Sequence, residues 1–223
     1  MNFQLIVRGL AGILFLITLL MILAGRITYW QGWLFGLICL LIVIAISIIF
    51  GKNFSEISER MKRGPGTKWW DILFWMIYGP MNMAIPVIAG LDAGRFGWSA
   101  PYSFSIYFIG YIIFTSSAFF HIWAIWSNKF YASTVRIQKE RQQIVITDGP
   151  YSYIRHPGYV GIMLMVGSMA LVLGSIWALL PAGVVAVLLV IRTALEDRTL
   201  KKELPGYLEY GNKVRYRLIP GIW

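Results

Sequence analysis

The chain has 223 residues, of which 58% are hydrophobic and only 13% are charged, whereas soluble domains average roughly 45–50% and about 25%. This composition, with a mean hydropathy of +0.66, excludes a disordered chain and argues against a soluble globular domain. The single cysteine excludes an internal disulfide framework, and the two histidines leave little for a histidine-rich metal site. We therefore expect an integral membrane protein without a metal site.

The net charge of +10 arises from basic residues that flank apolar runs, where they set the membrane topology and contact anionic lipid headgroups. No polar segment combines a basic stripe with interleaved aromatic residues, so the charge does not predict nucleic-acid binding. Membrane lipids are the expected partners, and nucleic acid is not.

Four apolar runs come first, each close to the about 20 residues that a helix needs to cross a bilayer. They are Gly9–Gly25, Tyr29–Phe50, Trp69–Gly90 and Tyr102–Trp126. The first run is followed by no small-residue cleavage site, so we interpret it as a retained helix and not as a signal peptide. Pro80 and Pro86 are expected to kink the third.

A last apolar block differs because Gly174-Ser175 divides it into two stretches of sixteen residues, 158–173 and 176–191. Two short helices in a hairpin fit this pattern. From Arg192 the chain is polar, and its first part predicts a helix that is broken at Pro205-Gly206. The predicted fold is an all-α integral membrane protein with about four transmembrane helices, a C-terminal helical hairpin (five to six spans) and a cytosolic C-terminal helix.

The Lys and Arg residues are distributed unevenly between the segments that separate these runs. If the N-terminus faces the cytoplasm, the inner segments hold 18 of the 20: Arg8, five in 51–68, five in 127–155 and seven from Arg192 onward. The outer segments hold only Arg26 and Arg95, which is a strong positive-inside signal. We expect both termini and both large polar segments on the cytoplasmic side. Residues 1–127 are then N-terminal transmembrane helices, and residues 128–223 carry the chemistry.

One cluster of polar residues precedes the hairpin. Asp148-Gly149-Pro150 is a typical turn sequence. His156 precedes a proline, which biases it away from helical dihedral angles, and Pro157 suits the first position of the next helix. His156 should therefore lie at a helix N-terminus, where backbone donors favour a carboxylate or phosphate. The alternative is that Arg155, His156 and Pro157 only cap the helix at the membrane interface.

A second cluster follows the hairpin. Arg192 and Glu196 are four residues apart and so share one helical face near the bilayer boundary. An arginine there suits a carboxylate or phosphate, and a glutamate suits a cationic group. The alternative is an ordinary ion pair within the helix on a wet surface. His121, inside the fourth run, is best explained as a buried histidine that is bonded to a neighbouring helix.

Together these clusters resemble a known family. Gly-Pro-Tyr (149–151), then Arg-His-Pro-Gly-Tyr-Val-Gly (155–161), an apolar hairpin, and Arg-x3-Glu-Asp (192–197) with Tyr207-Leu208-Glu209-Tyr210 downstream are similar to the isoprenylcysteine carboxyl methyltransferases. The related phospholipid methyltransferases share much of this pattern. The resemblance covers the chain from about Phe130 onward, whereas the first four spans match only as generic membrane helices.

The resemblance implies a membrane-embedded methyltransferase that uses S-adenosylmethionine and acts on a lipophilic substrate, such as the carboxylate of an isoprenylcysteine-like compound that enters from the bilayer. It implies a substrate role for Arg192 and a cofactor role for Glu196, with Asp197 where the family usually has a second glutamate. The implied cofactor-binding residues also include a polar upstream residue, Arg136 or Gln138. The others are Gln143, Ile144, Val145, Ile146, Tyr151, His156, Pro157, Gly158 and Tyr159.

Two other functions stay open at this stage. A membrane NADPH-dependent reductase of the sterol-reductase type is similar in its C-terminal architecture, and tight binding of NADPH would favour it. A non-enzymatic membrane protein, such as a transporter or a partner-binding subunit, is the other. Few charges within the spans and no clear repeat symmetry argue against it.

Overall fold

In the computed structural model, which describes residues 3–51 and 60–223, all regular elements of the described chain are helical. The long helices are α1 (Phe3–Ala24), α2 (Trp30–Phe50), α4 (Trp69–Ala89), α5 (Phe104–Ser127) and α7 (Leu179–Glu203). The shorter ones are α6 (Pro157–Val172) and α8 (Tyr207–Lys213). A π-helix, η1 (Gly90–Phe96), continues α4, and the 3-10 turns η2 (Lys139–Arg141) and η3 (Gly149–Ser152) lie between α5 and α6.

Five helices of the described chain are long and apolar enough to cross a membrane, and α6 is a shorter apolar helix. They are α1, α2, α4 with η1, α5 and α7. Their positions follow the predicted apolar runs closely because each run has the length and composition of a span. The expected all-α membrane fold with five to six spans is confirmed. Pro80 and Pro86 lie inside α4, which runs on as one helix to Ala89.

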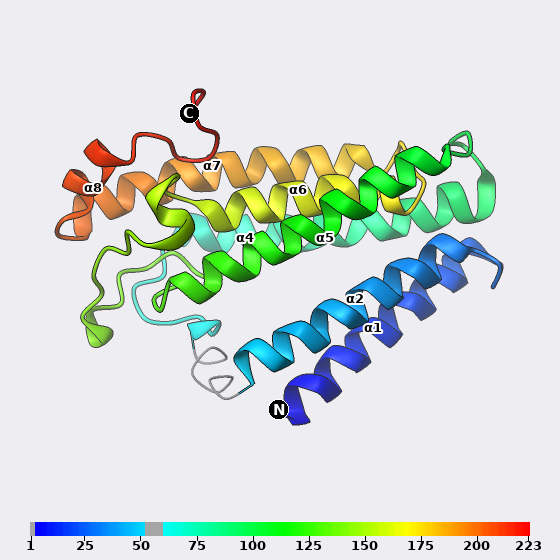
Figure 1. The fold of residues 1–223 in the computed structure, drawn as a ribbon, viewed down its shortest axis with the longest axis horizontal. Coiled ribbons are helices and arrows are strands. Elements are labelled where there is room, and N and C mark those ends of the chain that lie inside the picture. The colour runs from blue at the N-terminus through cyan, green and yellow to red at the C-terminus, as the bar shows by residue number, and fades with distance from the viewer. Residues whose placement is uncertain (1–2, 52–59) are drawn as a thin grey trace.

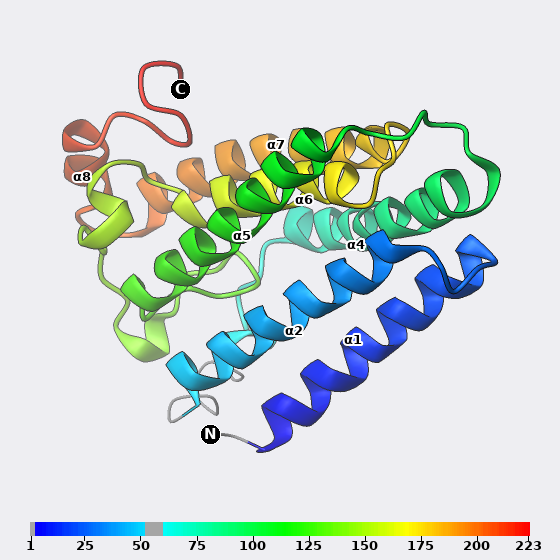
Figure 2. The same ribbon diagram turned by 45° about the vertical axis from the view of Figure 1, so that its right-hand side comes forward.

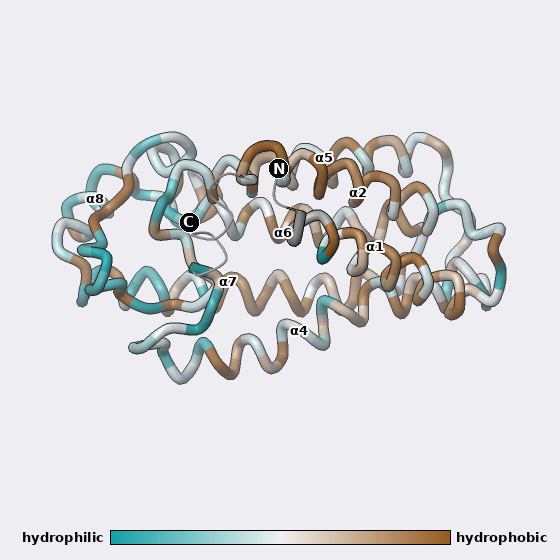
Figure 3. Tube along the Cα trace, turned by 90° about the horizontal axis from the view of Figure 1, so that it is seen from below, coloured by the Kyte–Doolittle hydropathy of each residue, from teal (hydrophilic) through white to brown (hydrophobic). Residues whose placement is uncertain are grey.

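The helices α1, α2, α4, α5, α6 and α7 run alternately in opposite directions along the bundle, so α5 and α7 are parallel (Figures 1 and 2). Hydrophilic residues gather at the end that carries α8 and the long connection between α5 and α6, while the middles of the helices are largely hydrophobic (Figure 3). Both large polar segments meet at this end, because Arg60, Lys62 and Arg63 line one hollow with Arg136 and Arg141. Lys52, the remaining basic residue predicted there besides Lys68, lies outside the described residues.

The predicted hairpin is formed by α6 and α7, with Gly174 in a left-handed conformation (φ +77°) between them. The hydroxyl of Ser175 donates a hydrogen bond of 2.6 Å to Asp92 in η1, which fixes the hairpin to the far end of α4. The second arm is longer than its apolar run suggests. α7 is one continuous helix from Leu179 to Glu203, so Arg192 and Glu196 are carried on the same rod as the membrane-spanning part.

The start of α6 packs directly against α5. A Cβ at Gly161 would lie 2.8 Å from the Cβ of His121 and 3.1 Å from its backbone, so only glycine allows this approach. His121 Nδ1 donates to the carbonyl oxygen of Gly158 at 3.0 Å, which confirms the predicted bond between His121 and a neighbouring helix. The N-terminus of α6 is therefore fixed in place against α5.

Candidate active site

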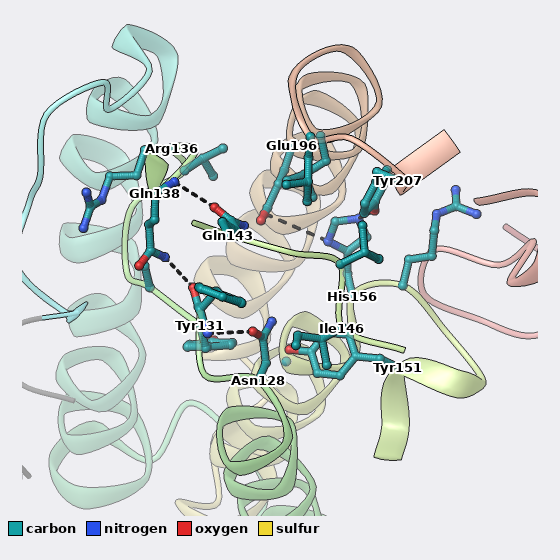
Figure 4. Close-up of a pocket in the computed structure, with 18 of the residues that line it drawn as sticks. Asn128, Tyr131, Arg136, Gln138, Gln143, Ile146, Tyr151, His156, Glu196 and Tyr207 are labelled. Atoms are coloured by element: carbon teal, nitrogen blue, oxygen red, sulfur yellow. Dashed lines mark hydrogen bonds and ion pairs between the residues drawn. The ribbon is translucent and has the colours of Figure 1, made fainter. Parts of the chain in front are cut away.

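A pocket opens at the hydrophilic end of the bundle, between α7 and the connection from α5 to α6 (Figure 4). The cavity has a volume of about 100 Å³. All residues predicted for the site line this pocket except Pro157 and Arg192. The lining residues among them are Arg136, Gln138, Gln143, Ile144, Val145, Ile146, Tyr151, His156, Gly158, Tyr159 and Glu196.

The turn predicted at Asp148-Gly149-Pro150 forms one wall. Gly149 has φ +60°, and a Cβ there would lie 2.5 Å from the hydroxyl oxygen of Ser127, so glycine is required. The turn places the buried ring of Tyr151 against the pocket. The backbone oxygen of Tyr151 accepts a hydrogen bond of 2.7 Å from the hydroxyl of Tyr210 in α8. This wall is thus held between α5 and α8.

His156 is the N-cap residue of α6, and Pro157 is its first helical residue, as the sequence predicts. The backbone N–H of His156 donates to the carbonyl oxygen of Arg217 at 3.0 Å. Its buried ring stacks on the ring of Tyr159, with an interplanar angle of 5°. The ring nitrogen Nδ1 lies 4.0 Å from Glu196 Oε2, and Nε2 lies 3.4 Å from the hydroxyl oxygen of Tyr207. The imidazole therefore sits between an acid and a phenol.

Glu196 presents its carboxylate to the pocket from α7 (Figure 4). One oxygen, Oε2, accepts a short hydrogen bond from the hydroxyl of Tyr159. Within the described part of the chain, no group donates to the other oxygen, Oε1. A half-buried carboxylate with one uncommitted oxygen is suited to a cationic group on a bound molecule.

The extended segment 143–146 forms the opposite wall. Gln143 is fixed by its side-chain oxygen, which accepts a hydrogen bond of 2.8 Å from the backbone N–H of Gln138. The backbone N–H and C=O groups of Ile144, Val145 and Ile146 have no hydrogen-bond partner within residues 3–51 and 60–223. Because unpaired backbone groups are costly when they are dehydrated, this edge is available for hydrogen bonds to a ligand.

Both alternatives for the upstream polar residue line the pocket. The side chain of Gln138 donates to the carbonyl oxygen of Phe130 at 2.6 Å and is fully buried. Arg136 pairs with Glu140 at 2.6 Å, and its side chain is only 7% exposed whereas Glu140 is exposed. Gln138 thus shapes the wall from within, while Arg136 is held by an exposed carboxylate.

Arg192 lies behind the pocket wall and does not pair with Glu196. Its Nε is 2.9 Å from Oδ1 of Asp71, a residue of α4, and its Nη2 donates to the backbone oxygen of Ser133 at 2.5 Å. The guanidinium faces the ring of Tyr159 at 5.4 Å, and Tyr159 separates it from the pocket. Since Arg192 is only 5% exposed, the alternative of an ordinary surface ion pair within the helix is wrong.

Asp197 points away from the pocket into a group of basic residues. Its carboxylate accepts a hydrogen bond of 2.7 Å from Arg155 Nε and one of 3.0 Å from Arg217 Nε. Lys201 Nζ lies 3.1 Å away, and the hydroxyl of Tyr207 also donates to it at 3.1 Å. Arg155 in turn donates to the carbonyl oxygens of Val214 and Arg215. Asp197 therefore joins α7 to the C-terminal segment.

Several lining residues were not predicted as site residues, among them Asn128, Tyr131, Tyr207 and Tyr210, although the last two belong to a motif of the family resemblance. The tyrosines share one electrostatic property. Burial raises the pKa of Tyr207, and the adjacent Asp197 carboxylate raises it further. Burial also raises the pKa of Tyr131 and of Tyr151. These phenols are neutral at physiological pH, so they serve the pocket as hydrogen-bond donors and apolar rings.

No group of three or more His, Cys, Asp or Glu side chains in the described chain is placed to hold a metal ion.

The family comparison bears on the chemistry directly. Residues 105–205 match the family model described as phospholipid methyltransferase. This match covers a little under half of the chain. The predicted family resemblance is thereby confirmed, and no curated protein matches the chain.

The phospholipid methyltransferase region begins in α5 and ends just after α7. It includes every predicted site residue and all pocket-lining residues up to Leu204. The helices α1, α2 and α4 lie outside it. The match to this family model and the five candidate spans together indicate a multi-pass membrane methyltransferase.

Proposed function

We propose that the pocket binds S-adenosylmethionine and that the protein transfers its methyl group to a lipophilic acceptor, such as the carboxylate of an isoprenylcysteine-like compound. The observation that carries this proposal is the carboxylate of Glu196, with its uncommitted oxygen, in a pocket within the phospholipid methyltransferase region. When bound, this cofactor supplies an electrophilic methyl group on a positively charged sulfur.

The residues of the pocket fit the chemical groups of this cofactor. Glu196 is suited to its ammonium group, and the unpaired backbone edge of 144–146 is suited to the hydrogen-bonding edge of its adenine. The N-terminus of α6 at His156–Gly158 favours its carboxylate. The phenols and the apolar side chains of Ile144 and Ile146 exclude water from the rest.

The acceptor requires positioning more than activation. A carboxylate is already ionised at neutral pH, so no strong general base is needed, and transfer depends on alignment of the nucleophile with the methyl group. In this proposal Arg192 orients the acceptor from the side of α4. The hydrophobic part of the acceptor enters from the bilayer, between the lipid-exposed helices.

The proposal extends to the membrane topology. The pocket lies at the hydrophilic end, and the basic segments around it support a cytoplasmic location for this end, where S-adenosylmethionine is available. Residues 128–223 then form the catalytic region, and residues 1–127 anchor it.

Calorimetric titration of the detergent-solubilised protein with S-adenosylhomocysteine, the demethylated product, tests the cofactor assignment. Replacing Glu196 by Gln removes a charge-assisted hydrogen bond of about 1.5–3 kcal/mol, so the Kd should rise roughly tenfold to a hundredfold. The matched control is Glu209→Gln, which replaces an exposed carboxylate on α8 and should leave the Kd for S-adenosylhomocysteine unchanged.

Two further outcomes would refute the assignment. Equal affinity in Glu196→Gln and wild-type protein would remove Glu196 from the site. Binding of NADPH without binding of S-adenosylhomocysteine would favour the reductase instead. If the cofactor binds, methyl-labelled S-adenosylmethionine presented with a prenylated cysteine or with an aminophospholipid identifies the acceptor class.

A further inference from the structure

We propose that Asp71, in the first turn of α4, is a positioning residue that holds Arg192 and the 133–135 segment in the arrangement needed for methyl transfer. This inference rests on the proposed function. Asp71 is fully buried at the end of an apolar helix, and it lies outside the phospholipid methyltransferase region. It is the means by which α4 takes part in the site.

Both oxygens of Asp71 contact parts of the site. Oδ2 accepts a hydrogen bond of 2.9 Å from the backbone N–H of Val135, and Oδ1 lies 2.9 Å from Arg192 Nε. Lys68, the N-cap residue of α4, donates a backbone hydrogen bond of 3.1 Å to the carbonyl oxygen of Val135. Thr134 and Val135 line the cofactor pocket. A single carboxylate thus orients a pocket wall and the arginine behind it.

Arg192 is restrained on almost every side. Its guanidinium lies 4.3 Å from the ring centroid of Phe74, and Tyr159 faces it at 5.4 Å. Nη2 is committed to the backbone oxygen of Ser133. In the described chain, no group accepts a hydrogen bond from Nη1. Arg192 is therefore held in place while the N–H groups of Nη1 remain for an incoming group.

Stability alone does not account for this pair. The N–H of Arg192 does not point at Asp71 Oδ1, so neither Nε nor Oδ1 has a hydrogen-bond partner despite their separation of 2.9 Å. A buried ion pair with such geometry seldom repays its desolvation, and ionisable residues within membrane spans are usually functional. Tyr159 connects the Asp71–Arg192 pair to the proposed cofactor pocket, because its ring faces Arg192 and its hydroxyl donates to Glu196.

The test compares Asp71→Asn with wild-type protein. Asparagine keeps the shape and the acceptor for Val135, and it removes the charge that orients Arg192. We expect kcat/KM for the acceptor to fall at least about tenfold, while the Kd for S-adenosylhomocysteine stays near the wild-type value. Glu203→Gln is the matched control, because its ion pair with Lys68 also joins α7 to α4 but is partly exposed. This control should retain activity.

Wild-type transfer rates in Asp71→Asn would overturn the inference while leaving the proposed function intact. If the wild-type protein itself transfers no methyl group, the proposed function fails, and a stability cycle still tests the contact. Arg192→Leu leaves Asp71 as an unpaired buried charge and should lower the Tm. The double variant Asp71→Asn/Arg192→Leu should recover at least half of that loss in Tm. A double variant no more stable than Arg192→Leu would show that the residues are not coupled and overturn the inference.

Discussion

Arg155 provides the sharpest test of how the pocket is held together. We consider its replacement by Met, which keeps an unbranched side chain and removes the five donors of the guanidinium. Arg155 is buried and bonds both oxygens of Asp197, at 2.7 Å and 3.3 Å, as well as the carbonyl oxygens of Val214 and Arg215. The substitution therefore removes the hydrogen bonds that join position 155, next to His156, to α7 and to the C-terminal segment.

The magnitude follows from these contacts. Removing one partner of a buried ion pair costs about 3–5 kcal/mol. Asp197 keeps Arg217 and Lys201, so we take the lower end, about 3 kcal/mol. In a protein of this size each kcal/mol lowers the Tm by about 2–4 °C. Arg155→Met should therefore unfold about 6–12 °C below the wild-type protein.

Thermal unfolding in detergent, followed by circular dichroism, measures this shift. Limited trypsin digestion provides a local readout, since cleavage after Lys213 and Arg215 should become faster. The matched control is Arg198→Met, which removes an exposed arginine from α7 and should change neither quantity. Wild-type Tm and wild-type protease resistance in Arg155→Met would refute the claim that Arg155 joins these segments.

Three further predictions follow from local geometry. Gly161→Ala should destabilise the protein by about 1–3 kcal/mol, because its Cβ would overlap His121. The control is Gly167→Ala in the same helix, where a Cβ meets open space and the stability should not change. Equal Tm values for the two variants would contradict this prediction. Tyr159→Phe removes the hydroxyl that orients Glu196 and should weaken S-adenosylhomocysteine binding about twofold to tenfold in calorimetry; unchanged affinity would argue against that role. Because burial raises the pKa of Tyr207, its folded phenol stays neutral where the unfolded phenol ionises, near pH 10. The Tm should thus fall above about pH 10 and fall less in Tyr207→Phe, whereas identical curves for the two proteins would contradict this.

The spans and the start of α6 could be predicted because they depend on local sequence. Each apolar run has the length of a membrane helix, and the sequence His156-Pro157 fixes where α6 begins through the restricted dihedral angles of proline and its predecessor. The grouping of 143–146 with Glu196 came from the family resemblance and not from any periodicity. Its geometry as one pocket is visible only in three dimensions.

The partners of the charged residues could not be predicted. Arg192 and Glu196 have the spacing of a helical ion pair, yet Arg192 pairs with Asp71 and Glu196 with Tyr159. These partners come from other helices, and Asp71 is separated from Arg192 by most of the length of the chain. Asp71 follows two tryptophans at the edge of an apolar run, so in the sequence it looks like an interfacial residue. Only the packing of α4 against α7 shows that it is buried.

The attachment of the C-terminal segment to the pocket bears on how the protein is made. The backbone N–H groups of Arg155 and His156 donate to the carbonyl oxygens of Tyr216 and Arg217, respectively, in the segment after α8. During synthesis the residues of α6 leave the ribosome long before these partners do. The wall around His156 therefore stays unfinished until translation has passed residue 217, and a prematurely terminated product would insert its helices without completing a binding-competent pocket.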